Sequence, residues 1–336
     1  MSSTDGAPVV WTSGRSLAHS RGPAGASRKT VLIALVANAI VTVVKLAGGL
    51  LSGSAAMLAE TAHSLADTVN QGFLLVSIAL ATREPTPDQP FGYGRMRFLW
   101  TFMAAVAMFL AGATFAIGYG IYQLASGPES GGYAAAYIAL AISLVAEGSS
   151  WLRAIHQTRA EARRAQVPVL RYIRATRDPN VKMVVFEDTA ALVGIAIAFV
   201  GILAGQLSGS TVLDPAASIA VGVLLVSVAG WMAHDTSELL VGASARPEER
   251  AAIEQTLAQC REIDRVLEVL TMVLGPTSLL VAARVDFAHG MDDDQVEQAS
   301  KSIEQRLREA VPDVTEVFLD ATTPPQRGSA PGRGSR

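Results

Sequence analysis

Four polar side chains recur at helical spacing within residues 55–81, a stretch that is otherwise mostly apolar. They are Glu60, His63, Asp67 and Asn70. Spacings of three, four and three residues place them on one stripe of a helix. His63 and Asp67 lie one turn apart, and an imidazole nitrogen with a carboxylate at this spacing can bind a divalent first-row metal ion. Zinc or a neighbouring transition metal fits this mixed donor set, whereas calcium and magnesium prefer oxygen donors alone.

A second acidic feature is the adjacent pair Glu187 and Asp188, which follows a short apolar run. Neighbouring side chains differ by about 100° around a helix, so only one of the pair can face a given partner. If Asp188 faces the first stripe, it joins His63 and Asp67 in the predicted metal centre. Glu187 or water then completes a roughly tetrahedral shell.

Each of these two features has an alternative interpretation without a metal. The stripe could be a polar seam of hydrogen bonds between helices, and the acidic pair could only cap or orient its own helix. Three ionisable groups lie within eight residues, from Glu60 to Asp67, which is more than such a seam needs. Because each ionisable group inside a membrane is costly, we favour a functional site on a water-filled pathway.

Polar residues in the other apolar stretches suggest different roles. Glu147 could neutralise a basic residue, shuttle protons or hydrogen-bond across a helix bundle, and the sequence leaves these roles open. Asp214 and Pro215 favour the start of a helix, since Asp suits the N-cap and Pro the first turn. Lys45 lies near a helix end, so we expect its ammonium group to extend to the membrane interface, and we expect Asn38 to pack between helices.

The composition places these residues in a membrane protein. Of 336 residues, 50% are hydrophobic and 17% are charged, and the mean hydropathy is +0.33. The net charge of -3 provides no basic field for nucleic acid, so we expect no nucleic-acid partner. The single cysteine, Cys260, excludes an intrachain disulfide and a CxxC-type zinc site, so any metal must use nitrogen and oxygen ligands.

Six apolar stretches are long enough to cross a lipid bilayer as helices. Residues 30–51 alone reach roughly 33 Å at about 1.5 Å per residue. The expected spans are 30–51, 55–81, 98–124, 133–152, 181–205 and 213–233. We therefore predict a six-helix transmembrane domain over residues 30–240. Residues 1–29 and 322–336 are rich in Gly, Ser, Pro and Arg, and we expect them to be disordered tails.

Basic residues in the connections predict the orientation of the spans. Lys and Arg concentrate before the first span and in the second and fourth connections, the last of which holds eight between Arg153 and Lys182. The alternate connections, 52–54, 126–132 and 206–212, contain none. Since Lys and Arg collect on the cytoplasmic side, we expect both termini there. The N-terminal residues contain no signal-peptide core, which agrees with a multi-pass protein of the plasma (inner) membrane.

A small cytoplasmic α+β domain is predicted over residues 241–321, where the composition becomes soluble. Its patterns follow the order helix, strand, strand, helix, strand, with a hairpin about Gly275 and Pro276. The fold class is thus an α-helical membrane protein with six transmembrane helices and a small α+β domain. His289 is the only histidine of this domain and lies near acidic residues, which favours a solvated acidic loop over a regulatory metal site.

Several motifs resemble the cation diffusion facilitator family of divalent metal transporters, and together they cover roughly residues 30–321. The main motif is SAAMLAETAHSLADTVNQ at residues 54–71, which contains His63 and Asp67. Three further segments resemble the family's loop before the third helix, its start of the sixth helix and its junction with the cytoplasmic domain. They are DQPFGYGR at 88–95, LDP at 213–215 and ELLVG at 238–242.

The resemblance implies a homodimer whose protomers each have six transmembrane helices and a ferredoxin-like cytoplasmic domain. It implies export of a divalent metal ion in exchange for protons, with His63, Asp67 and Asp188 at the family's ligand positions. Val184 departs from the pattern, because the family usually has His or Asp four residues before the fifth-helix Asp. The pair formed by Asp188 with Glu187 resembles instead the branch typified by zinc transporter 9.

The expected function is efflux of zinc by alternating access, with Fe, Mn, Co and Ni left open as substrates and no resident cofactor. A ligand must lose its proton to bind metal, so metal and protons compete; His63, with an unperturbed pKa of about 6.5, is the natural exchanged proton carrier. Two other classes stay open: a non-transporting membrane scaffold or regulator and, less favoured, an intramembrane metalloenzyme. An HExxH motif is absent, so we do not expect an enzyme.

Overall fold

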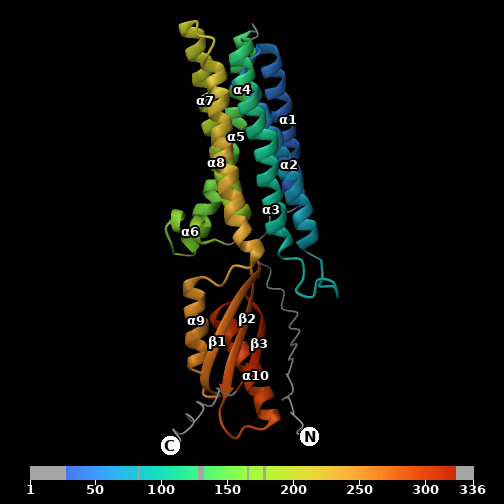
Figure 1. Ribbon diagram of the computed structural model, residues 1–336, viewed down its shortest axis with the longest axis vertical. Helices are drawn as coiled ribbons and strands as arrows, with labels where there is room; N and C mark the ends of the chain where they lie inside the picture. Colours follow the sequence, from blue (N-terminus) through green and yellow to red (C-terminus); the bar gives the residue numbers. More distant parts are fainter. Residues whose placement is uncertain (1–27, 82, 128–131, 165, 177–178, 323–336) are drawn as a thin grey trace, which may run out of the picture. The chain divides into compact units, whose positions relative to one another are not determined.

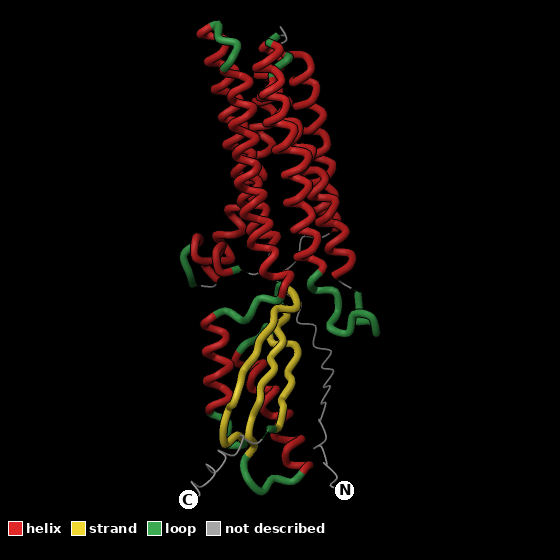
Figure 2. Tube along the Cα trace, viewed as in Figure 1, coloured by secondary structure: helices red, strands yellow, loops and turns green. Residues whose placement is uncertain are grey.

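A computed structural model of the chain describes residues 28–322, apart from residues 82, 128–131, 165 and 177–178. The tails expected at both ends lie outside the described residues, except for Arg28 and Lys29, which are helical, and Thr322. The described residues form two compact units that divide between Val241 and Gly242. Strands occur only in the second unit among the described residues (Figure 2).

The first unit is built of long helices that run side by side (Figure 1). They are α1 (Arg28–Ser52), α2 (Ala55–Ala81), α3 (Met96–Ala107), α4 (Thr114–Ser126), α5 (Tyr133–Arg164), the short α6 (Val169–Ala175), α7 (Pro179–Ser208) and α8 (Leu213–Val241). A turn of π-helix, η1 (Met108–Ala113), joins α3 to α4 in one continuous rod. With that rod counted once and α6 left aside, each of the six expected spans has a helical rod.

Five of these rods are long and apolar enough to cross a membrane. Among the described residues, these spans are Leu32–Ser52, Met96–Ser126, Tyr133–Arg164, Val184–Ser208 and Leu213–Val241. Helix α2, with 27 residues, is the sixth long rod. Its polar stripe is typical of a helix that carries ionisable groups to the interior of a bundle.

Helix α2 lies in the middle of the bundle, where it contacts α1, α3, α4, α7 and α8. Small side chains fill much of the interior: Ala59, Ala66, Ala113, Ala116 and Ala198 are all buried. Large apolar side chains point outward instead, as at Ile33 and Val145, which are 70% and 73% exposed. Small residues inside and large apolar residues outside are typical of helices that pack closely within lipid.

Glycines set the closest approach of α4 to α8. A Cβ added at Gly120 would lie 2.8 Å from the carbonyl oxygen of Pro215, and one at Gly222 would lie 3.0 Å from the backbone nitrogen of Ile117. Both distances are shorter than side chains tolerate, so hydrogen atoms alone fit at these positions. The close contact fixes α8 against the rod that also packs on α2.

The second unit confirms the predicted order of helix, strand, strand, helix, strand. Its elements are α9 (Pro247–Ala258), β1 (Ile263–Gly275), β2 (Ser278–Phe287), α10 (Asp293–Ala310) and β3 (Val314–Ala321). The sheet order is β1-β2-β3, with β1 and β2 antiparallel and β2 and β3 parallel. The hairpin pairs Gly275 with Ser278, which confirms the expected turn.

Alternate residues of β2 are buried, so one face of this sheet carries the core of the unit. Leu279, Val281 and Val285 are fully buried on β2, together with Ile253 of α9 and Ile303 of α10. The start of α10 is capped by Asp292, whose side chain accepts a hydrogen bond from the backbone nitrogen of Gln295. The acidic residues that predicted this helix start therefore act as its cap.

Candidate metal centre

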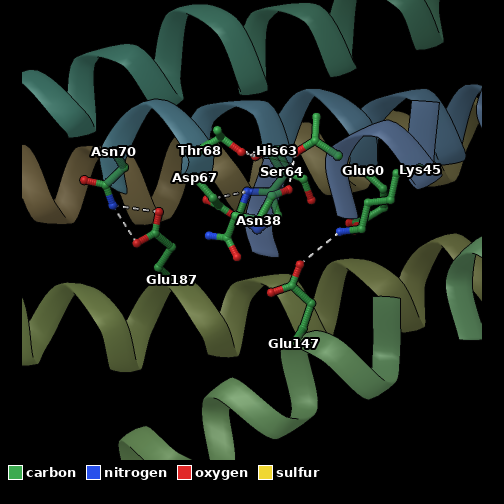
Figure 3. Close-up of polar contacts among 11 residues, drawn as sticks. Asn38, Lys45, Glu60, His63, Ser64, Asp67, Thr68, Asn70, Glu147 and Glu187 are labelled. Atoms are coloured by element: carbon green, nitrogen blue, oxygen red, sulfur yellow. Dashed lines mark hydrogen bonds and ion pairs between the residues drawn. The ribbon is translucent and has the colours of Figure 1, made fainter. Parts of the chain in front are cut away.

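The stripe predicted on α2 faces the interior of the bundle. His63 and Asp67 are 0% and 5% exposed, and Asn70 is 3% exposed. The Nδ1 atom of His63 lies 3.6 Å from Oδ1 of Asp67 (Figure 3). A helix places residues four apart one above the other, which brings the imidazole and the carboxylate together.

Helix α7 contributes Glu187 to this stripe. The amide nitrogen of Asn70 donates to both carboxylate oxygens of Glu187, at 2.8 and 2.7 Å (Figure 3). The carboxyl groups of Glu187 and Asp67 also lie close to each other. Glu187 is thus the member of the acidic pair that faces α2.

Asp188 faces a different neighbour, as the rotation of about 100° between adjacent helical residues requires. Its side chain lies close to Ser150 and Arg153 of α5. The structure brings His63 to Asp67 and Asp67 near Glu187, whereas no hydrogen bond or ion pair joins Asp188 to His63 or Asp67 among the described residues. The assignment of Asp188 as a ligand stays a prediction.

Several buried polar atoms at this centre lack hydrogen-bond partners in the described part of the chain. They are both ring nitrogens of His63, Oδ1 of Asp67 and Oδ2 of Asp188. A buried polar atom without a partner costs on the order of 1–3 kcal/mol, so such atoms call for an explanation. Imidazole nitrogens and carboxylate oxygens are the donors that a first-row divalent cation binds, and a cation would satisfy them.

The donors are not gathered into a compact cage. Within the described residues, no group of three His, Cys, Asp or Glu side chains is close enough to hold a metal ion. The exposed His289 of the second unit pairs with Asp264 at 3.1 Å and belongs to no such group. Side chains of α2 and α7 therefore have to move toward each other if the four predicted ligands are to bind one ion.

Lys45 does not extend to the membrane interface, so that expectation is wrong. The side chain is 0% exposed, and its Nζ atom lies 3.0 Å from Oε2 of Glu60 and 3.4 Å from Oε1 of Glu147 (Figure 3). Two carboxylates inside the bundle stabilise the ammonium group there. They come from other helices, so the sequence of the helix that carries Lys45 does not predict them. Of the roles left open for Glu147, the structure supports neutralisation of a basic residue.

Asp214 is a capping residue, but it caps α2 rather than its own helix. Its carboxylate accepts hydrogen bonds from Oγ of Ser54 at 2.6 Å and from the backbone nitrogens of Ala55 and Ala56 at 2.7 and 3.4 Å. These groups form the start of α2, which otherwise has unpaired backbone donors. Asp214 therefore holds the helix that carries His63 and Asp67, a role that sequence reasoning missed.

Known proteins are similar in sequence to this chain over most of its length. Residues 31–241 match the family described as the cation efflux transmembrane domain. The human proton-coupled zinc antiporter SLC30A9, mitochondrial, is 31% identical over 259 residues, which are 77% of this chain and 46% of the relative. The chain thus spans about half the length of the SLC30A9 relatives that it matches.

Two bacterial relatives match more evenly. The manganese efflux system protein MneP of Bacillus subtilis (strain 168) is 26% identical over 293 residues, 87% of this chain and 95% of the relative. The zinc transporter ZitB of Yersinia pseudotuberculosis is 28% identical over 216 residues, 64% of each. Because the family match over residues 31–241 covers more than half of the chain, the protein belongs to the cation efflux family, the cation diffusion facilitators that its motifs resemble.

Proposed function

We propose that this protein exports a divalent transition-metal ion in exchange for protons, and zinc is the first candidate for that ion. The observation that carries the proposal is the buried pair of His63 and Asp67, whose two ring nitrogens and one carboxylate oxygen have no hydrogen-bond partner among the described residues. A structural seam of hydrogen bonds would satisfy these atoms, whereas a site for a transient ion leaves them available.

The proposed ligands are His63, Asp67, Glu187 and Asp188. Glu187 already lies close to Asp67, and Asp188 follows it on α7. Since adjacent residues differ by about 100° around a helix, a rotation of α7 about its own axis by part of this angle would bring Asp188 toward the ion and keep Glu187 within reach of it. Such a rearrangement between packed helices is also what alternating access requires.

Proton exchange follows from the chemistry of the donors. An imidazole nitrogen must be deprotonated to bind metal, and a carboxylate binds metal as the anion, so the ion and the protons exclude each other. We propose that metal enters from the cytoplasm and displaces protons from His63 and the carboxylates. The protons return when the site opens to the opposite side and the metal leaves.

The choice of zinc rests on the mixed donor set and on the names of the relatives. Two of them are named as zinc transporters and one as a manganese efflux protein. Nitrogen and oxygen donors bind zinc, manganese, iron, cobalt and nickel, so manganese is the second candidate. We further propose a homodimer in the plasma (inner) membrane with both termini in the cytoplasm, on the basis of the family resemblance and the distribution of Lys and Arg.

A transport screen with purified protein in sealed proteoliposomes tests the proposal. Accumulation of Zn, Mn, Fe, Co and Ni is measured for the wild type and for Asp67→Ala, with Glu238→Gln, an exposed residue of α8, as the matched acidic control. We expect uptake of zinc that Asp67→Ala abolishes and Glu238→Gln preserves. No uptake of any metal by folded wild-type protein would contradict the proposal and favour a membrane regulator.

A further inference from the structure

One buried ion-pair network lies outside the proposed ligands. The ammonium group of Lys45 contacts Glu60 at 3.0 Å and Glu147 at 3.4 Å, and the side chains of Lys45 and Glu60 are both fully buried. A charge inside a membrane bundle is costly unless it is paired, and one cation shared by two carboxylates satisfies this requirement. The network is therefore a built feature of the interior, with a cost if it is broken.

The network joins three helices beside the metal centre and contacts a fourth. Lys45, Glu60 and Glu147 come from α1, α2 and α5, and α1 packs against both α2 and α5. The other carboxylate oxygen of Glu60, Oε1, points at α7, where a Cβ added at Gly194 would collide with it. The absent side chain of Gly194 therefore leaves the room that the Glu60 carboxylate occupies against α7.

The position of Glu60 along α2 places the network on one side of the metal centre. Glu60 lies three residues, or about one turn, from His63 in the direction of Ala55. Ala55 begins α2 directly after connection 52–54, which contains no Lys or Arg. An ion that leaves His63 toward this end of the helix must pass the level of Glu60.

We propose that Lys45, Glu60 and Glu147 form a charged gate that closes the metal centre on the side of connection 52–54. The ammonium group blocks the route of a divalent cation by repulsion, and its two ion pairs hold α1, α2 and α5 together. The gate opens when Lys45 and Glu60 separate, which exposes the free Oε1 of Glu60 as the next oxygen that the ion meets. The role of this network in gating rests on the proposed transport function. The closure of the metal centre on this side can be tested without transport.

Thiol labelling measures the closure directly. Cys260 is the only cysteine, so Cys260→Ser combined with Ser64→Cys creates a single thiol beside His63, at a position that is 2% exposed. A charged, membrane-impermeant thiol reagent is added to one or the other side of sealed vesicles that contain the full chain. Lys45→Met and Glu60→Gln are compared with Lys182→Met, which removes a different lysine ion pair, that between α7 and Asp235 of α8.

We expect Lys45→Met and Glu60→Gln to accelerate labelling at least about tenfold, and only from the side of connection 52–54, because loss of one partner destabilises the closed state. Lys182→Met should leave the rate unchanged. Equal acceleration from both sides would mean a loosened bundle and would overturn the proposal. An unchanged rate in both gate variants, with thermal unfolding like that of the wild type, would overturn it as well.

The failure of the gate and the failure of the proposed function are distinguishable. Loss of zinc uptake in Asp67→Ala tests transport, while thiol labelling requires no metal. If wild-type protein transports zinc but the gate variants label like the wild type, the metal centre stands and the gate is wrong. If the gate variants label faster but no metal is transported, the closure is real and belongs to a protein with another function.

Discussion

The pair of His63 and Asp67 shows what residue spacing predicts well. A separation of four residues brings two side chains together on any helix, and here it gives a distance of 3.6 Å between Nδ1 and Oδ1. The same reasoning fails for Glu187 and Asp188, because their relation to α2 depends on how α7 is rotated. That rotation is set by packing between helices, which the spacing along one helix does not contain.

Single substitutions of Glu187 and Asp188 test directly which of the two carboxylates binds the metal ion. Glu187→Gln should weaken zinc binding at least about tenfold, since it removes a charge that lies close to Asp67 and accepts from Asn70, and it keeps the size of the side chain. Isothermal titration of zinc into detergent-solubilised protein measures the change. Asp188→Asn is the matched variant: an equal loss places both carboxylates on the ion, and no loss leaves Asp188 with Ser150. Unchanged affinity in Glu187→Gln would exclude Glu187 as a ligand.

Lys45 shows where residue-level prediction ends. Its partners Glu60 and Glu147 are 15 and 102 positions away in the chain. A lysine near a helix end commonly extends to the membrane interface, and only knowledge of the neighbouring helices reveals two buried carboxylates. Glu147 itself is an unexplained intramembrane acid in the sequence, and such an acid indicates an internal cation.

At the scale of elements, α2 depends on a residue that is far away in the sequence. Asp214 of α8 caps the start of α2 across 160 positions in the chain. The sequence places an Asp before a Pro at a helix start, which correctly predicts a capping residue but not the helix that it caps. The carboxylate instead accepts from Ser54 and the first backbone nitrogens of α2.

Removal of this cap should destabilise the bundle. Asp214→Ala leaves the donors of Ser54, Ala55 and Ala56 without their acceptor, so we expect a loss of about 1–2 kcal/mol. Unfolding of the purified protein in detergent, followed by circular dichroism, measures the change. Ser54→Ala removes one of these three hydrogen bonds and also the one that Ser54 Oγ accepts from the backbone nitrogen of Met57, so it should destabilise the start of α2 as well. Equal stability of Asp214→Ala and wild type would show that the cap does not hold α2.

Packing between α4 and α8 gives a second prediction at this scale. Gly222→Ala should destabilise the bundle by about 1–3 kcal/mol, because the added methyl group collides with the neighbouring rod at Ile117. Gly230→Ala on the same helix is the control, since a Cβ there meets nothing within 4 Å. Alanine favours helix over glycine by about 1 kcal/mol, so Gly230→Ala should be neutral or stabilising. Similar unfolding of both variants would refute the packing argument.

At the scale of the whole molecule, the sequence predicts the long rods and the order of elements in the second unit. Apolar length and turn residues suffice for this, because an apolar stretch of about 20 residues predicts a spanning helix. The short α6 and the π-helical turn η1 (Met108–Ala113) were not predicted. A helix of 7 residues is too short to show a clear helical period in its sequence. A turn of π-helix has no distinct residue pattern.

Orientation of the whole chain is a prediction from the connections. Since Lys and Arg occur in alternate connections, the C-terminus should lie in the cytoplasm. A reporter enzyme that is active only in the cytoplasm, fused after Arg336, should be active, and one fused within connection 206–212 should be inactive. The reverse pattern of activity would place the chain in the opposite orientation.

The most direct test of the whole account is the proton flux driven by zinc. Proteoliposomes that contain a pH-sensitive dye are loaded with wild-type protein, Asp67→Ala or Glu238→Gln, and a zinc gradient is applied. We expect zinc-dependent movement of protons in the direction opposite to that of zinc in the wild type and in Glu238→Gln. We expect no such movement in Asp67→Ala. Zinc-driven proton flux of normal size in Asp67→Ala, or zinc transport without any proton movement, would contradict the claim that metal and protons compete for this centre.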